Sequence, residues 1–221
     1  MELIKRKSNI EVIGEVPWGT HFCLFYETKN DLIDVLVPYF KAGLENNEYC
    51  MWITSEPLNH NEAVNLLEKH MPDFDNYRKK KQIEIIPHDQ WYKINNEFDS
   101  QRVLDGWTSK LEYALQMGFD GLRLTGNTFW LEDEDWNSFY EYEQEINKVI
   151  GNYNMLAICS YSLSKCGPTE ILDVVHSHQF ALFRRKKQWE MFKSMEQLKA
   201  EKKINNLKKN IALYLNQVLM E

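Results

Sequence analysis

The chain has 221 residues, of which 43% are hydrophobic and 27% charged, and its formal net charge is −7. This composition excludes disordered and collagen-like chains, and the length suffices to bury at least one full-sized core. The longest apolar runs are strand-sized and the N-terminus is charged, so we expect neither a membrane span nor an export signal. The chain has four cysteines at scattered spacings, Cys23, Cys50, Cys159 and Cys166. This pattern favours reduced thiols in a cytoplasmic protein.

Short apolar runs alternate with longer helix-period segments along the chain. Runs rich in aromatic and β-branched residues predict strands over residues 21–26, 49–54, 82–87, 121–125 and 155–161. Helical periodicity predicts helices over residues 30–45, 59–70, 99–117, 133–150 and 169–183. Apolar strands joined by helices are typical of a parallel sheet covered on both faces. We therefore predict an α/β domain within residues 1–183, a three-layer sandwich with a mainly parallel sheet.

The C-terminal part, residues 184–221, has a different charge and pattern. It carries ten Lys or Arg against four Glu, a net charge of +6, which leaves −13 for the residues before it. It contains no Gly or Pro, and a coiled-coil spacing of 3, 4, 3, 4 joins Ile204, Leu207, Ile211, Tyr214 and Val218. We predict a helical tail that forms a homodimer, parallel or antiparallel. We interpret the basic charge as a solvated helix face, in preference to a surface for an acidic protein partner or for nucleic acid. We therefore expect no nucleic-acid binding.

In an open parallel sheet, ligands bind beyond the carboxyl ends of the strands. The segments that follow the predicted strands are aromatic with a few polar groups, which suits a small, partly apolar organic molecule. A phosphate-binding loop needs glycines, but residues 26–32 (YETKNDL) contain none, and Glu27 and Asp31 would repel phosphate. GxSxG, HExxH and deaminase motifs are also absent from the sequence, so we expect a protein that is not an enzyme.

Several ordered motifs resemble one known family over residues 21–183. They are HFCLFYETKNDLIDVLVPYFKAGLENNEYCMWITSEP, IIPHDQWY, GLRLTGNTFWL, the YEYE around Tyr142, and LAICSYS followed by DVVHSH. They resemble the MEDS domain, a sensory domain shared by methanogen and methylotroph signalling proteins. The resemblance implies a fold similar to KaiC and RecA ATPases without the phosphate-binding loop. It also implies binding of small hydrocarbon-derived ligands upstream of a kinase or a transcription regulator.

The resemblance also nominates ligand-binding residues by position. They are His21, Cys23, Tyr26, Trp91, Tyr92, Arg123, Trp130, Tyr142, Glu143, Cys159, Tyr161 and His178. The implied RecA-like strand order makes the first and fifth strands neighbours, which brings Cys23 close to Cys159. Two positions depart from the family pattern, Ser162 and Gln179, and both concern the lip of a pocket more than the fold.

Three groups of candidate residues have both a functional and a structural interpretation. His21 and Cys23 share a strand face, and with Cys159 they could bind zinc or form a redox pair, or else be two buried thiols and a core histidine. Arg123 in an apolar strand needs a carboxylate, for which Glu143 or Glu141 is the natural partner, either as a brace or as a ligand anchor. The tryptophans Trp52, Trp91 and Trp130 either line a pocket or form core.

We therefore predict a cytoplasmic, non-enzymatic sensory domain that binds a small organic ligand without a cofactor or a resident metal. About 20 residues precede the first strand and only the tail follows the body, so we expect the signal to leave through the tail or through a partner such as a kinase or regulator. The alternatives are a thiol-redox or metal sensor that uses Cys23, Cys159 and His21, and a degenerate KaiC-like nucleotide-binding enzyme. A cysteine nucleophile, Cys23 or Cys159 with His21 as base, is a further possibility.

Overall fold

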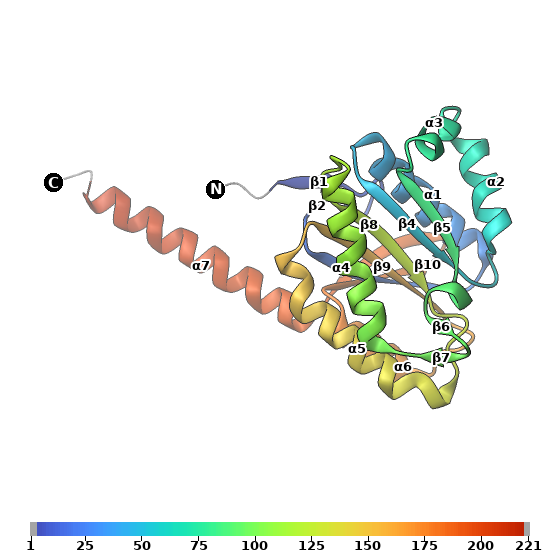
Figure 1. Ribbon diagram of the computed structural model, residues 1–221. Coiled ribbons are helices and arrows are strands. Elements are labelled where there is room, and N and C mark those ends of the chain that lie inside the picture. The colour runs from blue at the N-terminus through green and yellow to red at the C-terminus, as the bar shows by residue number, and fades with distance from the viewer. Residues whose placement is uncertain (1–3, 219–221) are drawn as a thin grey trace.

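A seven-stranded sheet forms the middle layer of the structure (Figure 1). The computed structural model describes residues 4–218, with side chains except those of residues 196, 208, 210 and 212–218. The strands lie in the order β11 (Gln188–Lys193), β10 (Phe180–Arg185), β3 (Thr20–Tyr26), β9 (Met155–Ser162), β8 (Leu122–Asn127), β4 (Tyr49–Thr54) and β5 (Ile83–Pro87). All neighbours are parallel except β10 and β11. The predicted three-layer α/β fold is confirmed.

Helices cover both faces of this sheet. On one face lie α1 (Lys29–Glu45) and α2 (His60–His70), and the other face carries α4 (Ser100–Gln116), α5 (Trp136–Val149) and α6 (Pro168–Ser177). The smaller elements are the hairpin β1 (Lys5–Lys7) with β2 (Glu15–Pro17), the hairpin β6 (Lys93–Ile94) with β7 (Glu97–Phe98), α3 (Phe74–Lys79), and the 3-10 turns η1 (His88–Gln90), η2 (Asp133–Asp135) and η3 (Ile150–Asn152).

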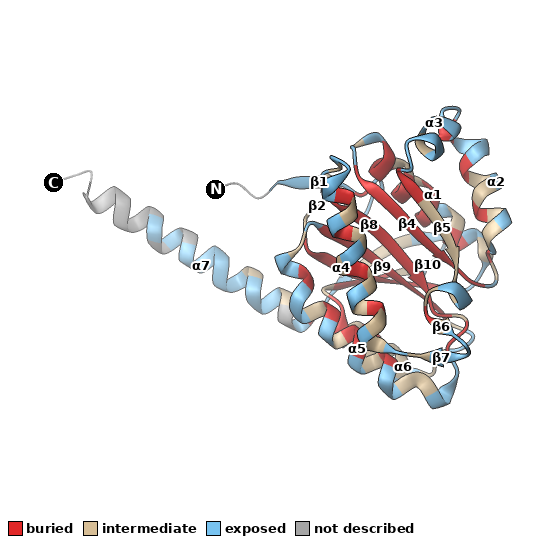
Figure 2. Cartoon of the chain, in the orientation of Figure 1, coloured by how far each residue is buried: buried red, intermediate tan, exposed pale blue. Residues whose placement is uncertain are grey.

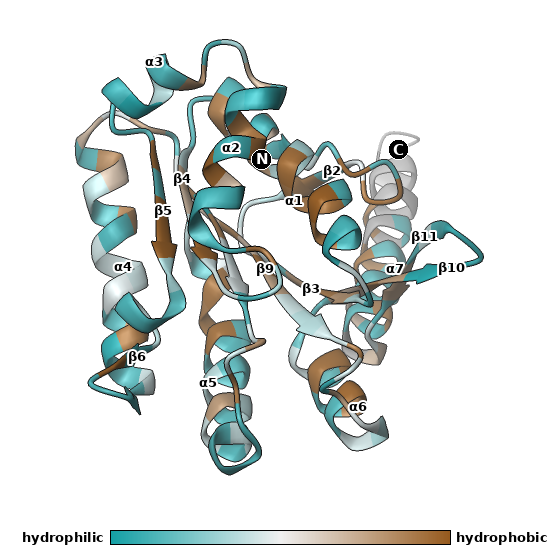
Figure 3. Cartoon of the chain, turned by 90° about the vertical axis from the view of Figure 1, so that its right-hand side faces the viewer, coloured by the Kyte–Doolittle hydropathy of each residue, from teal (hydrophilic) through white to brown (hydrophobic). Residues whose placement is uncertain are grey.

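The central strands are buried on both faces, as Figure 2 shows. Because successive side chains of a strand point to opposite faces, β3 contributes to two separate cores. Phe22, Leu24 and Tyr26 pack toward α1 and α2, whereas Cys23 and Phe25 pack toward α4, α5 and α6. Apolar residues also concentrate on the strands and on the sheet-facing sides of the helices (Figure 3). This two-sided burial explains why the strands read as continuous apolar runs.

The segment after α6 differs from the prediction. We expected one helix over residues 169–183 and a helical tail from Arg184, but α6 ends at Ser177 and the chain then forms β10 and β11. The apolar residues of β10 pair with β3 and complete the sheet core. Lys186 and Lys187 turn the hairpin with φ of 50° and 64°. Turns with positive φ are usually marked by Asn-Gly, whereas lysines are unusual in this left-handed region. The sequence therefore carries no local signal for this turn.

The helical tail is α7 (Met195–Val218), which projects away from the sheet (Figure 1). Of the predicted apolar seam, Ile204, Leu207 and Ile211 are exposed, and the side chains of Tyr214 and Val218 lie outside the described residues. Within residues 4–218, helices that are both long and apolar enough to cross a membrane are absent.

Candidate functional site

Four ionisable side chains from distant parts of the chain meet between the sheet and α5. His21 Nε2 lies 3.2 Å from Glu143 Oε2 and 3.4 Å from Cys159 Sγ. His178 Nε2 lies 3.4 Å from the same Glu143 oxygen, and the two imidazole rings are 4.0 Å apart. None of the four residues is more than 4% exposed. We call His21, Glu143, Cys159 and His178 the buried cluster.

Each member reaches the buried cluster for a local reason. His21 on β3 and Cys159 on β9 point to the α5 face, because the parallel register places Cys23 opposite Cys159 and both strands alternate together. Glu143 lies on the apolar face of α5. His178 follows the last residue of α6 in an extended conformation, with φ of −124° and ψ of 154°, and is fully buried.

Burial controls the protonation of the buried cluster. It lowers the pKa of His21 to about 3, and burial together with the neighbouring His21 lowers the pKa of His178 to about 3. Burial also raises the pKa of the Glu143 carboxyl group, although His178 opposes this shift. The pKa of the Cys159 thiol rises because of burial and the adjacent Glu143. Without a bound cation, the buried cluster therefore favours neutral imidazoles and a neutral thiol, and burial shifts the Glu143 carboxyl group toward its protonated form.

Several polar atoms of the buried cluster lack a hydrogen-bond partner among the described residues. They include both carboxyl oxygens of Glu143, Nδ1 of His21 and Nε2 of His178. Two nitrogens of the buried cluster do have partners. Nδ1 of His178 lies 2.7 Å from the carbonyl oxygen of Val174 and donates to it, and Nε2 of His21 lies 3.4 Å from the Cys159 sulfur. Buried polar groups in native proteins are almost always paired, so these atoms mark a site rather than ordinary core.

An apolar cavity of about 40 Å³ adjoins the buried cluster and has Cys159 as a common wall. It lies between α4, α5 and strands β8 and β9 and is lined by Tyr92, Leu104, Trp107, Thr108, Leu124, Tyr142, Ile146, Val149, Ile150, Tyr153, Met155, Ala157 and Cys159. The side chain of Val149 is 40% exposed, whereas Tyr92 and Cys159 are buried, so the cavity runs from the surface toward the buried cluster.

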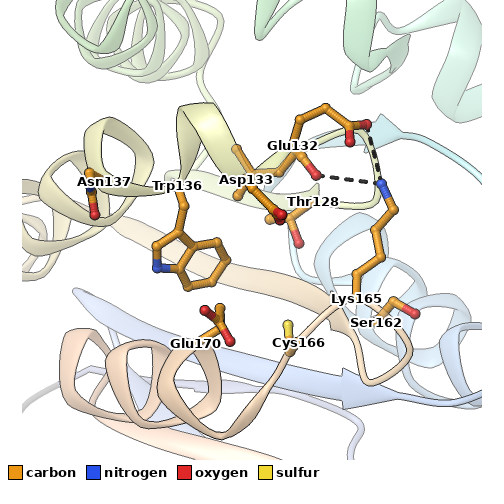
Figure 4. Close-up of a pocket in the computed structure, with 10 residues that line it drawn as sticks. Thr128, Glu132, Asp133, Trp136, Asn137, Ser162, Lys165, Cys166 and Glu170 are labelled. Carbon is orange, nitrogen blue, oxygen red and sulfur yellow. Dashed lines mark hydrogen bonds and ion pairs between the residues drawn. The ribbon is translucent and has the colours of Figure 1, made fainter.

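A polar pocket of about 250 Å³ lies at the carboxyl ends of β8 and β9 (Figure 4). The Lys165 ammonium group lies beside Glu132, as Figure 4 shows. Its nitrogen is 3.4 Å from the Glu132 carboxylate and 3.5 Å from the carbonyl oxygen of Leu131. The remaining charged groups of the lining, Asp133 and Glu170, are acidic. A lining with this charge disfavours an anionic ligand.

Four of the nominated aromatic residues, Trp91, Tyr92, Trp130 and Tyr142, gather around the apolar cavity. Tyr92 and Tyr142 line it directly. Trp91 packs 4.5 Å from the Trp107 ring, and Trp130 packs 5.2 Å from the Tyr92 ring. Gly126 allows this packing, because a side chain at that position would displace Tyr92. These aromatic side chains therefore form one connected wall.

Other nominated residues lie near the buried cluster or away from it. The Tyr161 ring packs 5.9 Å from the His178 ring. Cys23 is a buried neighbour of Cys159, but its sulfur lies 3.7 Å from the carbonyl oxygen of Phe180. Tyr26 lies on the opposite face of the sheet, where its hydroxyl donates to Asn127 at 3.2 Å. The predicted set of His21, Cys23 and Cys159 is thus replaced by one in which Glu143 and His178 take the place of Cys23.

The prediction that Glu143 or Glu141 pairs with Arg123 was wrong. Arg123 Nε donates to Glu48 at 2.5 Å, whereas Glu143 lies across the sheet. The alternation along β8 turns Arg123 toward α1, where a side chain on Gly43 would lie 2.6 Å from its Cδ. Further donation to the carbonyl oxygens of Tyr39 and Lys7 completes a structural anchor.

Sequence reasoning missed the role of Glu48. It also did not predict that Glu143 and His178 lie together. Glu143 carried a readable signal, since it lies four residues after Phe139 and three before Ile146 on the apolar stripe of α5. A carboxylate in such a stripe is costly to bury without a partner. Glu48 carried no comparable signal, because it lies in the short loop between α1 and β4.

The N-terminus of α1 is occupied by a side chain of the protein itself. The Asp31 carboxylate accepts from the backbone N–H of Glu27, at 3.1 Å, and of Thr28, at 2.8 Å, and also pairs with Arg184. Burial raises the pKa of Asp31, but hydrogen bonds from Arg184 and Thr28 outweigh it, so the pKa lies below its usual value. In a phosphate-binding loop these N–H groups would face the ligand.

Comparison with known proteins agrees with this fold and arrangement. The family described as "MEDS: MEthanogen/methylotroph, DcmR Sensory domain" matches residues 20–179. The chain belongs to the MEDS family. This MEDS chain is also 25% identical, over 180 residues, to the transcriptional repressor DcmR of Methylorubrum extorquens (strain DSM 6343 / CIP 106787 / DM4). The alignment covers 80% of the chain and 64% of the repressor, so the chain spans just under two thirds of the repressor's length.

Two solved structures share the fold of this MEDS chain. A KaiC-like protein from Pyrococcus horikoshii OT3 superposes with a TM-score of 0.54 at 17% identity, covering 88% of this chain and 90% of the other. The flagellar accessory protein FlaH from Methanocaldococcus jannaschii gives a TM-score of 0.51 at 11% identity, with coverages of 86% and 85%. The KaiC-like fold implied by the resemblance is therefore confirmed, and a sensory or regulatory role is the one that family membership supports.

Proposed function

We propose that this chain is a sensory domain that binds a small apolar organic molecule in the apolar cavity and passes the signal through α7. The observation that carries the proposal is the cavity itself, whose walls are aliphatic and aromatic side chains contributed by the sheet, α4 and α5. Ligand sites of this kind are concave, mostly apolar and supplied with a few fixed polar groups.

The size and polarity of the cavity define the class of ligand. A volume of about 40 Å³ suits a molecule of a few heavy atoms. The Tyr142 hydroxyl accepts a hydrogen bond from Trp107 Nε1 at 2.7 Å, which fixes one polar group at the wall. A small halocarbon, hydrocarbon or short alcohol fits this environment, whereas a polyphosphate does not.

The route from the cavity to the tail is short. Cys159 joins the cavity to the buried cluster, and His178 of that cluster precedes Gln179. The Gln179 carbonyl oxygen accepts from the N–H of Ser194 at 3.0 Å, next to the first residue of α7. A ligand that favours one position of these groups shifts the population of tail arrangements.

In this proposal α7 also forms a homodimer with a second copy of the chain. Ile204, Leu207 and Ile211 repeat at spacings of 3 and 4 and are 51 to 58% exposed on a helix that leaves the body. The similarity to a transcriptional repressor supports a regulator as the output partner, in the cytoplasm. The Asp31 carboxylate at the α1 N-terminus supports a domain that does not hydrolyse nucleotides.

The experiment is a titration of the full chain with n-butanol, followed by amide NMR, with sodium butyrate as the charged comparison. We expect n-butanol to shift amide signals of β8, β9, α4 and α5, and butyrate to leave them unchanged at the same concentration. Thr108→Phe fills the cavity from α4 and should weaken the response at least about tenfold. The control is Ser109→Phe, on the exposed side of the same helix turn. Equal responses of the two variants, or none from the unmodified chain, would contradict the proposal.

A further inference from the structure

Beyond the organic ligand, we infer that the buried cluster binds one divalent transition-metal ion, with Zn²⁺ as the best match. His21, Glu143, Cys159 and His178 each offer one ligand atom, and these atoms all lie within 4.8 Å of one another. The inference concerns the metal alone and does not depend on whether the apolar cavity takes a ligand.

The spacing of the ligand atoms matches tetrahedral coordination. Metal–ligand bonds of about 2.0–2.3 Å place neighbouring ligand atoms about 3.3–3.6 Å apart in a tetrahedron. Three of the six separations are close to this range, at 3.2 Å and 3.4 Å from His21 Nε2 to Glu143 and Cys159, and 3.4 Å from His178 Nε2 to Glu143. The other three pairs lie within 4.8 Å and would close to the same spacing when an ion binds.

Once Cys159 and Glu143 give up their protons, the lone pairs of these atoms face one another without a donor between them. The carbonyl oxygen of Val174 fixes the proton of His178 on Nδ1, so Nε2 presents a lone pair to the Glu143 carboxyl group. Metal-binding histidines are held in this way by a second-shell acceptor. A cation between Nε2 and the carboxylate satisfies both atoms, which otherwise lack partners.

The charge of the loaded site balances. Two neutral imidazoles, one thiolate and one carboxylate carry two negative charges, which a divalent ion neutralises inside the core. Binding replaces the proton of the Cys159 thiol and any proton on Glu143, both of which leave to solvent. The neutral sum explains how a carboxylate and a thiolate can share one fully buried space.

The donor atoms identify the class of ion. Nitrogen and sulfur donors select zinc-like transition metals, whereas Mg²⁺ and Ca²⁺ prefer oxygen. All four positions are filled by protein, as in structural zinc sites. Because the ligands come from β3, α5, β9 and the end of α6, the ion would tie the helical layer to the sheet beside the cavity.

The test is to unfold the full chain in urea, remove metal with a chelator, and refold it with Co²⁺, Zn²⁺ or Mg²⁺. We expect one Co²⁺ per chain by elemental analysis, intense visible bands of tetrahedral Co²⁺ and a near-ultraviolet thiolate-to-cobalt band. Zn²⁺ should displace Co²⁺, and Mg²⁺ should not. Cys159→Ser should remove the thiolate band, and His178→Gln should weaken Co²⁺ binding at least about 100-fold.

Two matched controls lie next to these positions. Cys23→Ser removes the other buried thiol of the β3–β9 pair, and His176→Gln removes an exposed histidine of α6. Both should keep the thiolate band and bind Co²⁺ within twofold of the unmodified chain. If Cys159→Ser does not refold, the unmodified chain and Cys23→Ser decide the question by themselves.

A folded, unmodified chain without Co²⁺ or without a thiolate band would overturn the inference. So would a band that survives in Cys159→Ser but disappears in Cys23→Ser. In the first case the buried cluster is held by shared protons alone.

Discussion

The two faces of the sheet each bury a glutamate, and the two glutamates have opposite surroundings. On the α1 face, Glu48 accepts from Arg123 at 2.5 Å and from Arg6 at 2.7 Å. On the α5 face, Glu143 meets two imidazoles and a thiol, and neither of its oxygens has a hydrogen-bond partner among the described residues. A buried carboxylate with dedicated guanidinium partners braces a fold, whereas one without such partners marks a place where something binds.

The comparison also separates two uses of charge. The Arg123 guanidinium stays charged in the core, because Glu48 and the carbonyl oxygens of Tyr39 and Lys7 satisfy it. The groups of the buried cluster avoid charge, because burial lowers the pKa of its imidazoles to about 3 and raises that of its carboxyl group. On the α1 face, the charged groups are therefore paired within the protein. On the α5 face, the charge of the buried cluster depends on whether a cation is bound.

The largest expected effect is on the Glu48 face. Glu48→Gln leaves the buried Arg123 guanidinium without its carboxylate, while Arg6 keeps Asp120 at 3.1 Å, and breaking a buried pair on one side costs about 3–5 kcal/mol. We expect a loss of this size in the free energy of unfolding, measured by urea denaturation. The control is Glu45→Gln, whose partner Lys41 lies 3.8 Å away at the surface, and its loss should stay within about 0.5 kcal/mol. Similar losses for both variants would show that Glu48 is not the anchor we describe.

The second effect is a pH dependence confined to the other face. In metal-free protein the pKa of His178 is about 3, because burial and His21 lower it, whereas the unfolded value is near 6.5. Between these values the unfolded chain binds the extra proton, so this contribution to stability is present above pH 6.5 and is lost as the pH falls. When the pH is lowered from 7 to 5, the free energy of unfolding of His178→Gln should therefore fall by about 2 kcal/mol less than that of the unmodified chain.

The measurement is urea denaturation in chelator at both pH values. Glu143 titrates in the opposite direction, because its raised pKa destabilises the fold as the pH rises, and it is present in both chains. His176→Gln provides the control, since His176 is exposed. Equal acid losses in all three chains would mean that His178 is not held neutral by burial.

Sequence patterns predicted the layers of this fold better than its edge and its sites. The strands β3, β4, β8 and β9 are buried on both faces, and Thr28 with Asp31 starts α1 as a capping box, so local chemistry determines these elements. The β10–β11 hairpin was missed, because its burial depends on pairing with β3 and its turn uses two lysines. Long-range pairing of this kind is not visible in local periodicity.

The candidate site shows the same limit. The family motifs named all four members of the buried cluster, but the sequence grouped His21 with Cys23 and Cys159, and Arg123 with Glu143 or Glu141. Strand alternation turned Arg123 toward α1, away from Glu143 on the α5 face. Cys23 does share the α5 face with His21, but its sulfur lies beside the carbonyl oxygen of Phe180. Glu48 joined Arg123 only through the packing of the α1–β4 loop, which the sequence does not specify.

The smallest expected effect completes the comparison of the two glutamates. Glu143→Gln should change the free energy of unfolding of the metal-free chain by less than about 1 kcal/mol at pH 5. The reason is that burial raises the pKa of Glu143, which shifts the carboxyl group toward the neutral form that glutamine copies in size and polarity. With Zn²⁺ present at refolding, only the unmodified chain should gain stability, because the variant lacks a negatively charged ligand. A metal-free loss as large as that of Glu48→Gln would instead mean that Glu143 is an ionised brace like its counterpart, and the distinction between the two faces would fail.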